Sequence, residues 1–556
     1  MHAPVLIVGA GPVGLALAGD LGFRGVSCLL IEKSDGVVVQ PKMDMVGIRT
    51  MEYCRRWGIV PWVESAGYNR EYPQDYAWVT SLNGYEFGRE PFACPRDEKC
   101  PPQSPQKRER CPQNFFDPTL RRFAEQWPGV EIRYHAELVD FTQGDDGVLA
   151  TVVDSRTGER SQIRSAYIVG TDGGASRVRE TLGIRMTGEP ALTYTTNVIF
   201  RTDNLEALHD KKPGYRFIFI GPEGTWATLV AIDGRDRWRF SLVGDEEKRA
   251  HGEDYLRTAI VRAVGRDFDF EILSIMPWIR RQLVADAYRV GRAFLAGDSA
   301  HLTSPTGGFG MNTGIQDAVN LSWKLAGALQ GWGGEHLLDS YEIEQRPVAI
   351  RNVGEATQNL KRMLSPRVTA PAPEIFGDGP GSAEARKEFG DQYTAMMKRE
   401  WFSIGIHLGY VYEGSPIVAP DGTPQPPDEV STYRQTARPG SRAPHVWLAP
   451  GQSTLDYFGK AYVLLRFGSE APSGAELAEE AKRIGVPFAI VSIDNAEAAA
   501  LYERKLVLVR PDGQVAWRGD LSPPHPRWLF DVVRGAQSIS ETTANDAGAP
   551  VAEIAE

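Results

Sequence analysis

The N-terminal segment constrains the fold of this chain more than any other feature of the sequence. The apolar run VLIV, residues 5–8, predicts a buried strand, and Gly9, Gly11 and Gly14 follow it with the spacing GxGxxG. A helix is expected next, and a second apolar run, SCLLIE, ends at Glu32. This order of strand, glycine turn, helix and strand predicts a parallel βαβ unit, and hence an α/β fold.

The same segment has the chemistry to bind a dinucleotide. Glycines let the backbone approach a pyrophosphate, the helix N-terminus offers it N–H donors, and an acid about 20 residues further on accepts hydrogen bonds from ribose hydroxyls. A structural glycine turn is the alternative, but here strand, helix and acid occur in register. We therefore expect a cofactor site formed by Gly9, Gly11, Pro12, Val13, Gly14, Glu32 and Lys33.

Charge and hydropathy argue against several classes of protein. The formal net charge of -11 argues against nucleic acid or an anionic membrane as the partner. There is no run of about 18 apolar residues, so we expect no membrane-spanning helix. The N-terminus lacks the basic region of a signal peptide and cysteines are sparse, which favours reduced thiols in a cytoplasmic protein. Cys94, Cys100 and Cys111 form no CxxC pair and have no nearby histidine, so we expect no metal site.

The remainder of the chain suggests two further domains. Between residues 190 and 285, short aromatic and β-branched runs predict an antiparallel sheet inserted between halves of the first domain. From about residue 430, an order of strand, helix, strand, hairpin and helix resembles a thioredoxin-like domain, without the CxxC pair that such domains use for redox chemistry. In the first half of the chain, Asp117 followed by Pro118 predicts the first turn of a helix.

A second glycine loop lies far along the chain from the first. Residues 292–326 contain an apolar run that ends at Asp298, then the loop SPTGGFG, then a helical pattern from about Met311. A glycine loop that opens a helix is suited to an anion or a dipole, although a catalytically silent turn would have the same pattern. Two such turns favour one large ligand bound by both.

Three motifs of the chain resemble those of one enzyme family. They are the GxGxxG sequence at Gly9, the dipeptide Asp172-Gly173 within YIVGTDGGASRVRE, and the GD pair at Asp298 with its glycine loop. Their order is similar to that in class A flavoprotein aromatic hydroxylases, the family of para-hydroxybenzoate hydroxylase and phenol hydroxylase. The resemblance covers residues 1 to about 350, and the C-terminus resembles that of longer members, including phenol hydroxylase. It implies FAD as cofactor, NADPH or NADH as co-substrate, and hydroxylation of a small phenolic substrate by O2 through a flavin C4a-hydroperoxide.

The resemblance also implies a domain plan. We expect an α/β protein in which a Rossmann-like FAD-binding domain is interleaved with an antiparallel-sheet substrate domain and followed by a thioredoxin-like C-terminal domain. The expected boundaries are 1–75, 100–185 and 286–365 for the FAD-binding domain, 76–99 and 186–285 for the substrate domain, 366–425 for a helical linker, 426–540 for the thioredoxin-like domain, and 541–556 for a disordered tail.

Residue roles follow from the same resemblance. The helix that begins near Met311 would point its positive end at the N1–C2=O edge of the flavin, which carries negative charge when reduced. Lys42 stands where many members have arginine, and Ser299 stands where they have alanine. Beyond the first motif, the expected FAD contacts are Lys42, Gln113, Asp172, Asp298, Pro305, Gly308, Gly310, Met311 and Asn312.

Asp44, in the segment PKMDMVGIRTME, is the candidate catalytic residue. It occupies the position of an aspartate implicated, in phenol-hydroxylase-like members, in deprotonating the phenol. An ordinary aspartate is a poor base for this step, because its pKa of about 3.9 lies ~6 units below that of a phenol. Burial between Met43, Met45 and Val46 would raise the pKa of Asp44 and narrow the gap. The alternative is that Asp44 caps a helix starting near Gly47.

The middle sheet is expected to form the substrate wall. Tyr215, Phe217 and Trp226 would line it, with Pro305 beside the isoalloxazine, although strand alternation turns only half of such residues inward. His301, next to the GD pair, is interpreted as structural. The leading hypothesis is a phenol-hydroxylating enzyme of aromatic catabolism that could form a homodimer. The alternatives are a hydroxylase of a larger polycyclic natural product or antibiotic, and an FAD-binding protein without hydroxylation.

Overall fold

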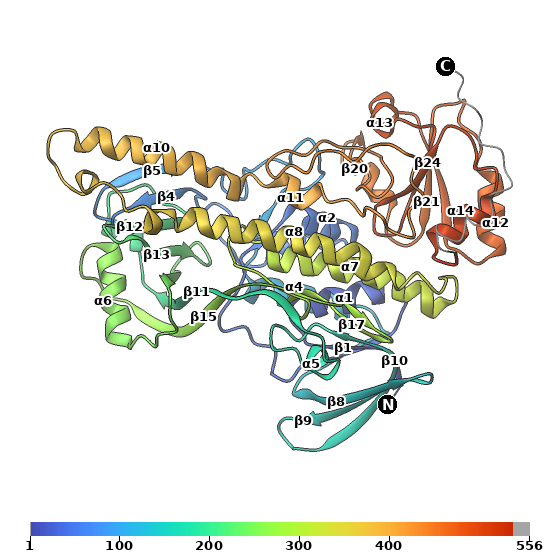
Figure 1. Cartoon of the computed structure of the whole chain (residues 1–556), viewed down its shortest axis with the longest axis horizontal. Helices are drawn as coiled ribbons and strands as arrows, with labels where there is room; N and C mark the ends of the chain where they lie inside the picture. Colours follow the sequence, from blue (N-terminus) through green and yellow to red (C-terminus); the bar gives the residue numbers. More distant parts are fainter. Residues whose placement is uncertain (1, 538–556) are drawn as a thin grey trace.

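The computed structural model describes residues 2–537, and two large sheets dominate it (Figure 1). The predicted tail, residues 541–556, lies outside the described residues. The N-terminal unit has the predicted order of β1 (His2–Val8), α1 (Pro12–Phe23) and β2 (Cys28–Ile31), and β1 pairs in parallel with β2.

The first sheet is largely parallel. Its central strand β1 is fully buried at residues 5–7, as expected for a strand covered on both faces. Helix α1 packs against α4 (Gln113–Glu125) and α7 (Phe309–Gln330). In spatial order the strands are β16 (Arg289–Val290), β17 (Ala293–Leu295), β10 (Arg160–Gly170), β1, β2 and β7 (Val130–Arg133), with β8 (Ala136–Gly144) and β9 (Gly147–Asp154) attached to β10. The carboxyl ends of β1, β2 and β10 therefore meet at one edge.

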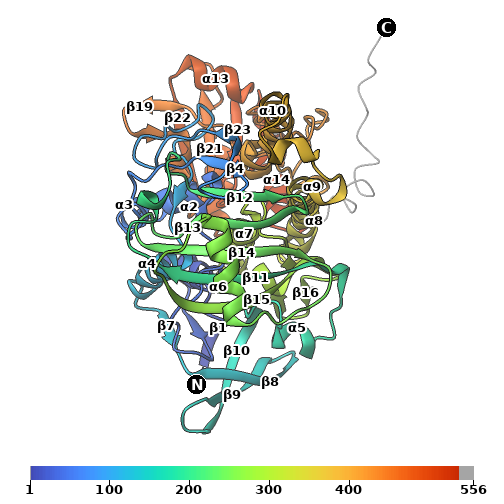
Figure 2. The same ribbon diagram turned by 90° about the vertical axis from the view of Figure 1, so that its left-hand side faces the viewer.

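The second sheet is antiparallel except where β4 pairs with β12 in parallel. One of its faces is covered by α6 (Glu253–Val264), which lies across the strands in Figure 2. In spatial order the strands are β18 (His301–Leu302), β15 (Glu271–Ala285), β11 (Met186–Arg201), β14 (Arg237–Asp245), β13 (Gly224–Ala231), β12 (Arg216–Gly221), β4 (Tyr76–Val79) and β5 (Glu86–Glu90). The presence of β4 and β5 in this sheet supports the proposal that residues 76–99 belong to the substrate domain.

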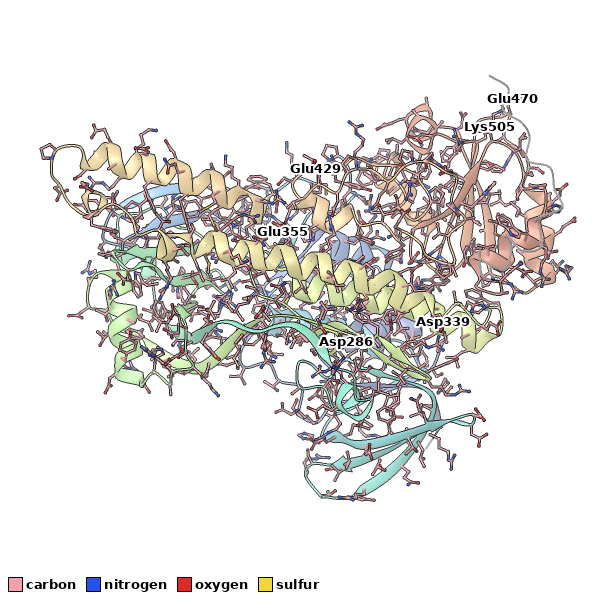
Figure 3. The ribbon with its side chains drawn as sticks, viewed as in Figure 1. Asp286, Asp339, Glu355, Glu429, Glu470 and Lys505 are labelled. Atoms are coloured by element: carbon pink, nitrogen blue, oxygen red, sulfur yellow. The ribbon has the colours of Figure 1, made fainter. Side chains whose placement is uncertain are left out.

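Long helices connect the sheets to the C-terminal region. Helices α7 and α8 (Ser340–Met363) pack side by side and run from the second sheet toward the C-terminal domain (Figure 1). Helix α10 (Ser382–Trp401) packs against β5 and α8. Side chains fill the space between these helices and the sheets, as Figure 3 shows.

The C-terminal domain has its own four-stranded sheet. The predicted hairpin forms around Pro511–Gly513, between β23 and β24. An additional helix, α13 (Ala496–Tyr502), was not expected from the sequence; the Asn495 side chain caps it by accepting a hydrogen bond of 2.9 Å from the N–H of Ala498. The other elements are β22 (Phe488–Ile493), β21 (Tyr462–Phe467), β23 (Leu506–Val509), β24 (Val515–Gly519), α12 (Ala475–Arg483) and α14 (Pro526–Val533).

Helix α4 begins earlier than the sequence predicts, whereas α7 begins close to its expected start. Helix α4 begins at Gln113, so Asp117 is not its N-cap and Pro118 lies inside the helix. The Asp117 side chain instead accepts a hydrogen bond of 3.0 Å from Gln113 Nε2, within the helix. Helix α7 begins at Phe309, close to the expected start near Met311. Among residues 2–537, no helix is both long and apolar enough to cross a membrane.

Candidate active site

A cavity of about 970 Å³ lies between the carboxyl edge of the first sheet and the second sheet. Both glycine loops singled out in the sequence line it. Gly14 and Asn312 do not. The expected FAD contacts that line the cavity are Gly9, Gly11, Pro12, Val13, Glu32, Lys33, Lys42, Gln113, Asp172, Asp298, Pro305, Gly308, Gly310 and Met311.

The first glycine loop fits the pyrophosphate of FAD. Gly9 has φ +104°, and a Cβ there would lie 2.5 Å from the carbonyl oxygen of Thr171, so only glycine is accommodated. A Cβ at Gly11 would meet nothing within 4 Å, which leaves open space in front of α1. Helix α1 has no side-chain cap and no acid in its first turn, so its N-terminal N–H groups suit an anion. Gly14 serves packing, because a Cβ there would lie 2.0 Å from the carbonyl oxygen of Gly9.

Glu32 is fixed beside the first loop by backbone hydrogen bonds. Its Oε2 accepts a bond of 2.9 Å from the N–H of Ala10, and its Oε1 accepts a bond of 2.9 Å from the N–H of Ser34. Since Glu32 directly follows β2 and lines the cavity, its carboxylate is suited to the ribose hydroxyls of the ADP half.

The second loop brings another helix N-terminus to the same cavity. Gly308 precedes α7 with φ +68°, and α7 has neither a side-chain cap nor an acid in its first turn. Gly310 and Met311 in that turn line the cavity. The positive end of α7 therefore faces the cavity, where it is suited to stabilise negative charge on a ligand.

Asn312 does not line the cavity; its side chain forms hydrogen bonds with other parts of the protein. Its Oδ1 accepts hydrogen bonds of 2.8 Å from the N–H of Gly47 and 2.7 Å from Thr50 Oγ1. Its Nδ2 donates to the carbonyl oxygens of Met45, at 3.2 Å, and Gly308, at 2.7 Å. Asn312 thus joins the second glycine loop to the segment that follows Asp44.

Three other expected contacts have partners within the protein. Asp172 Oδ1 accepts a hydrogen bond of 3.0 Å from the Ser299 hydroxyl, so the serine that replaces the family's alanine has a structural role. Gln113 Oε1 accepts a bond of 3.1 Å from the backbone N–H of Lys42. The Lys42 ammonium lies 5.6 Å from the centroid of the Trp278 ring. Lys42 and Trp278 therefore form one side of the cavity together.

Alternate residues of the second sheet form the opposite wall of the cavity. Successive side chains of a strand face opposite sides, so every second residue is available to this wall. The wall residues are Thr195 and Asn197 of β11, Arg216 of β12, Thr228 and Val230 of β13, Arg239 and Ser241 of β14, and Met276, Trp278 and Arg280 of β15.

Two of the expected substrate-lining residues lie on the wrong face for that role. Phe217 and Trp226 pack into the cluster beneath α6, whereas Arg216, next to Phe217, faces the cavity. The Trp226 ring also lies 4.0 Å from the guanidinium carbon of Arg262 on α6. The sequence does not show which face of β12 meets the cavity, nor that the pairing of β12 with β13 shifts register at Trp226, between Thr225 and Ala227. Tyr215 and Pro305 do line the cavity.

Asp44 lies between two arginines and a tyrosine. Its Oδ1 accepts a hydrogen bond of 3.1 Å from Arg110, and its Oδ2 accepts bonds from Arg239, at 3.2 Å, and from the Tyr215 hydroxyl. Helix α2 (Ile48–Arg56) follows an N-cap at Gly47 and has no side-chain cap. The alternative that Asp44 caps this helix is therefore wrong.

Comparison with protein families decides the identity of the fold and its cofactor. Residues 2–356 match the model of the FAD binding domain, and residues 436–534 match that of the aromatic-ring hydroxylase C-terminal domain. The chain belongs to the class A flavoprotein monooxygenases. The expected family and fold class are thereby confirmed, and the chain is an FAD-dependent hydroxylase.

Similar proteins span nearly the whole length of this monooxygenase. A putative polyketide hydroxylase from Streptomyces halstedii is 35% identical, over 94% of this chain and 94% of its own. RebC, solved after soaking with chromopyrrolic acid and with bound 7-carboxy-K252c, is 38% identical with a TM-score of 0.89, over 97% of this chain and 100% of that one. Aklavinone-11 hydroxylase, solved with FAD and aklavinone, is 29% identical with a TM-score of 0.81, over 96% of this chain and 99% of that one.

The electrostatics of Asp44 in this monooxygenase differ from expectation. Burial alone would raise the pKa of Asp44, but the charges of Arg110 and Arg239 and the hydrogen bond from Tyr215 outweigh burial and lower it. Burial raises the pKa of Tyr215 well above its ordinary value. The expected raised pKa of Asp44 is therefore wrong, because the sequence neighbours suggested only an apolar setting.

Arg110 and Arg239, which both donate to Asp44, are among the functional-site residues that sequence reasoning missed. Arg110 lies at the end of the proline-rich loop and reaches Asp44 because β6 (Glu109–Arg110) pairs with β3 (Met45–Val46). Its guanidinium carbon also lies 3.6 Å from the centroid of the Tyr215 ring. The alternation within DRWRFSLVG was the available signal for Arg239, since it separates the charged from the aromatic face.

The two histidines nearest the second loop differ in setting. His301 does not line the cavity, and its Nε2 lies 2.9 Å from Oδ2 of the buried Asp317, which supports the structural interpretation. His407 does line the cavity, and burial, aided by the charges of Arg108 and Arg351, lowers its pKa to about 4. His407 is therefore neutral near pH 7.

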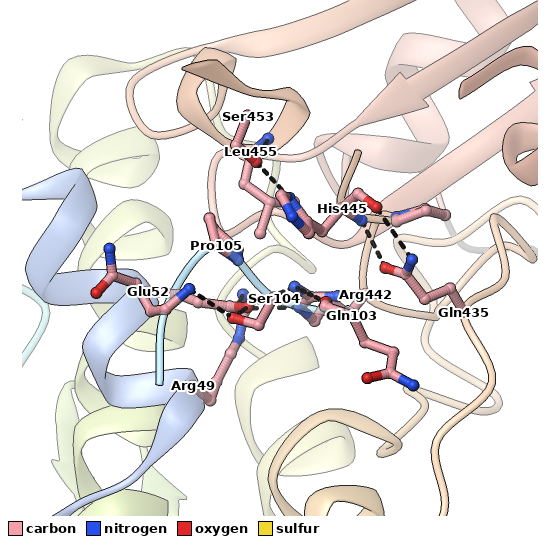
Figure 4. Close-up of polar contacts among 12 residues, drawn as sticks. Arg49, Glu52, Gln103, Ser104, Pro105, Gln435, Arg442, His445, Ser453 and Leu455 are labelled. Carbon is pink, nitrogen blue, oxygen red and sulfur yellow. Dashed lines mark hydrogen bonds and ion pairs between the residues drawn. The ribbon is translucent and has the colours of Figure 1, made fainter. Parts of the chain in front are cut away.

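The helix that follows Asp44 is anchored to the C-terminal region. Glu52 on α2 accepts a hydrogen bond of 3.0 Å from Arg442 Nε, 2.7 Å from Arg49 and 2.6 Å from the Ser104 hydroxyl (Figure 4). These side chains are buried. The Asp44 segment is thus tied at its far end to Arg442, which lies outside the matched FAD binding domain.

Proposed function

We propose that this FAD-dependent monooxygenase hydroxylates an aromatic ring of a larger, polycyclic substrate of the polyketide type, with O2 and with NADPH or NADH as the reductant. This substrate class takes precedence over the simple phenol that the sequence first suggested. The relative at 35% identity is named a polyketide hydroxylase, and a solved relative was crystallised with aklavinone.

The observation that carries the proposal is the sheet wall, which shares one cavity with both glycine loops. The cavity volume of about 970 Å³ has to accommodate FAD as well as the substrate, so the side chains of the wall are the better guide to the substrate class. The wall offers the aromatic side chain of Trp278 with the apolar side chains of Met276 and Val230. Such a wall is suited to a flat ring system beside the flavin.

The residues around the two loops would hold FAD. The N-terminus of α1 would hold the pyrophosphate, Glu32 the ribose, and the N-terminus of α7 the flavin edge that becomes negative on reduction. Bound FAD would supply the reduction of O2 and the transfer of one oxygen atom to the ring.

Asp44 would align the substrate by accepting a hydrogen bond from its phenolic hydroxyl. A carboxylate whose pKa is lowered is a weak base but a good acceptor. The neighbouring cations of Arg110 and Arg239 would lower the pKa of that hydroxyl and stabilise the phenolate form. Electron density in the ring would rise accordingly, which favours attack on an electrophilic oxygen.

NADPH and NADH oxidation by the FAD-loaded protein tests this function, with H2O2 measured in parallel. The panel contains simple phenols, hydroxybenzoates and hydroxyanthraquinones. We expect the strongest stimulation and the least H2O2 with a hydroxyanthraquinone. Tight coupling with a simple phenol, and none with any polycyclic compound, would contradict the proposed substrate class.

A further inference from the structure

Arg280 is a buried cation of the cavity wall that lacks a carboxylate partner. The residue is 5% exposed; Nε donates to Thr195 Oγ1 at 2.9 Å and Nη1 donates to Ser304 Oγ at 3.4 Å. Within residues 2–537, no carboxylate lies within 4.0 Å of its guanidinium group, and Nη2 donates to no residue. Burying a charge without a counter-ion is costly, so a group that stays buried and unpaired needs an explanation.

The other guanidinium groups around this wall all have acidic partners. Arg110 and Arg239 share Asp44, and Arg216 pairs with Glu400 at 3.0 Å. Together with the unpaired group, four guanidinium groups face two carboxylates here. The wall is therefore locally cationic in a protein whose net charge is -11.

The charges around Arg280 show the same excess of cations over carboxylates. Burial lowers its pKa to about 9; the charges of Arg216 and Arg239 act in the same direction, and Glu400 only partly opposes them. A negative group placed against Arg280 would offset this cost.

We propose that Arg280 binds a carboxylate group carried by the polycyclic aromatic substrate. The proposal deepens the proposed function and rests on it. Nη1 has one long hydrogen bond and Nη2 has none, so both can donate to one carboxylate in the planar, two-bond arrangement that arginine favours. On β15, Arg280 follows the wall residues Met276 and Trp278 at alternate positions, so one ligand can contact all three.

A matched pair of ligands tests the proposal by binding alone. The probes are 1,8-dihydroxyanthraquinone-3-carboxylate and 1,8-dihydroxy-3-methylanthraquinone, which differ only in the charged group. Affinity for the FAD-loaded protein is measured from the perturbation of the flavin absorbance. We expect the carboxylate to bind the wild-type protein more tightly than the methyl compound. In Arg280→Met, its affinity should fall about 10- to 100-fold, with little change for the methyl compound.

Two further variants separate recognition from folding. Arg280→Lys keeps the charge without the planar fork and should retain an intermediate preference for the carboxylate. Arg201→Met, which changes an exposed arginine at the end of β11, should leave both affinities unchanged.

Each contrary outcome has a distinct meaning. Equal binding of the two compounds to the wild-type protein would overturn the inference about Arg280 and leave the polycyclic substrate class intact. Loss of FAD affinity in Arg280→Met, with the preference for the carboxylate compound retained, would show that Arg280 binds the flavin. That result would also overturn the inference about Arg280. If neither compound binds, the proposed function and the inference both fail.

Discussion

The backbone N–H of Gly47 donates a hydrogen bond of 2.8 Å to Asn312 Oδ1, and this bond ties the first turn of α7 to the segment that carries Asp44. The two residues belong to parts of the chain with different proposed roles. Asn312 lies in α7, the helix proposed to stabilise the flavin, and Gly47 follows Asp44, the carboxylate proposed to align the substrate. The relative position of these two groups therefore depends on one buried amide.

Replacing Asn312 with alanine should loosen this connection. The N–H of Gly47 and the hydroxyl of Thr50 would lose their shared acceptor, at a cost of about 1–3 kcal/mol in the free energy of unfolding. We expect more NADPH to be consumed as H2O2 in this variant. Asn312→Asp retains the acceptor and should lie between alanine and wild type. Wild-type coupling and stability in Asn312→Ala would contradict the role of Asn312.

Asp44→Asn should reduce hydroxylation far more than it reduces FAD binding. A neutral amide cannot balance Arg110 and Arg239, so we expect kcat to fall at least about tenfold while the Kd for FAD stays within a few-fold. Steady-state turnover assays measure kcat, and titration of the protein with FAD measures the Kd. Tyr215→Phe removes only one donor to Asp44 and should have a smaller effect. Unchanged turnover in Asp44→Asn would exclude a catalytic role.

The pH dependence of turnover distinguishes an acceptor from a base. Because the pKa of Asp44 is lowered, the group stays ionised throughout pH 5 to 8, and its titration should not appear in the kcat profile there. A rise in kcat through that range that disappears in Asp44→Asn would mean that Asp44 acts as a base with a raised pKa.

Glu52→Gln tests the anchor between α2 and the C-terminal region. Burial raises the pKa of Glu52, but Arg442 and Arg49 outweigh burial and lower it to about 2, below the ordinary value of 4.5. A lowered pKa stabilises the fold above the unfolded-state pKa, and the contribution declines as pH falls toward 2. The stability difference from wild type should therefore be about 3 kcal/mol at pH 7 and shrink below pH 4.5.

Denaturant unfolding at several pH values measures this difference. Glu253→Gln, at an exposed pair with Arg257, is the control and should change stability little at any pH. A difference for Glu52→Gln that is constant down to pH 2 would show that ionisation of Glu52 does not stabilise the fold.

The glycines of the first loop should respond differently to alanine. A Cβ at Gly9 would clash with the carbonyl of Thr171 at a φ of +104°, so Gly9→Ala should destabilise the protein even without FAD, by about 1–3 kcal/mol. A Cβ at Gly11 would point into open space, so Gly11→Ala should weaken FAD binding and leave the stability of the FAD-free protein unchanged. Equal FAD affinity in Gly11→Ala and wild type would contradict the assigned pyrophosphate site.

Local sequence patterns identified most of the residues of the proposed cofactor site that line the cavity, although Gly14 and Asn312 do not line it. The βαβ unit and the GD loop each lie within one short segment, so spacing alone brings Gly9, Glu32 and Gly308 to positions that line the cavity. The substrate half was less predictable, because it depends on pairing between distant segments. Arg110 reaches Asp44 only through the short β3–β6 pair, and this contact reverses the expected direction of the pKa shift.

Strand register explains why two aromatic residues of the second sheet were assigned to the cavity wall. Phe217 and Trp226 were chosen for their aromatic character, but the cavity face of their strands is set by registry with neighbours, which one sequence does not display. The start of α4 was predicted too late because the sequence signal chosen for it lies inside the helix. The Asp-Pro pair is a typical helix start, and here the preceding turn is already helical.

The most direct test of the central claim is oxygen labelling of the product. The FAD-loaded protein is incubated with NADPH, 18O2 and the hydroxyanthraquinone that gives the tightest coupling, and the product is analysed by mass spectrometry. The account predicts a product that carries one added hydroxyl group labelled with 18O, in an amount close to the NADPH consumed. Unchanged anthraquinone, with the NADPH consumption recovered as H2O2, would contradict it.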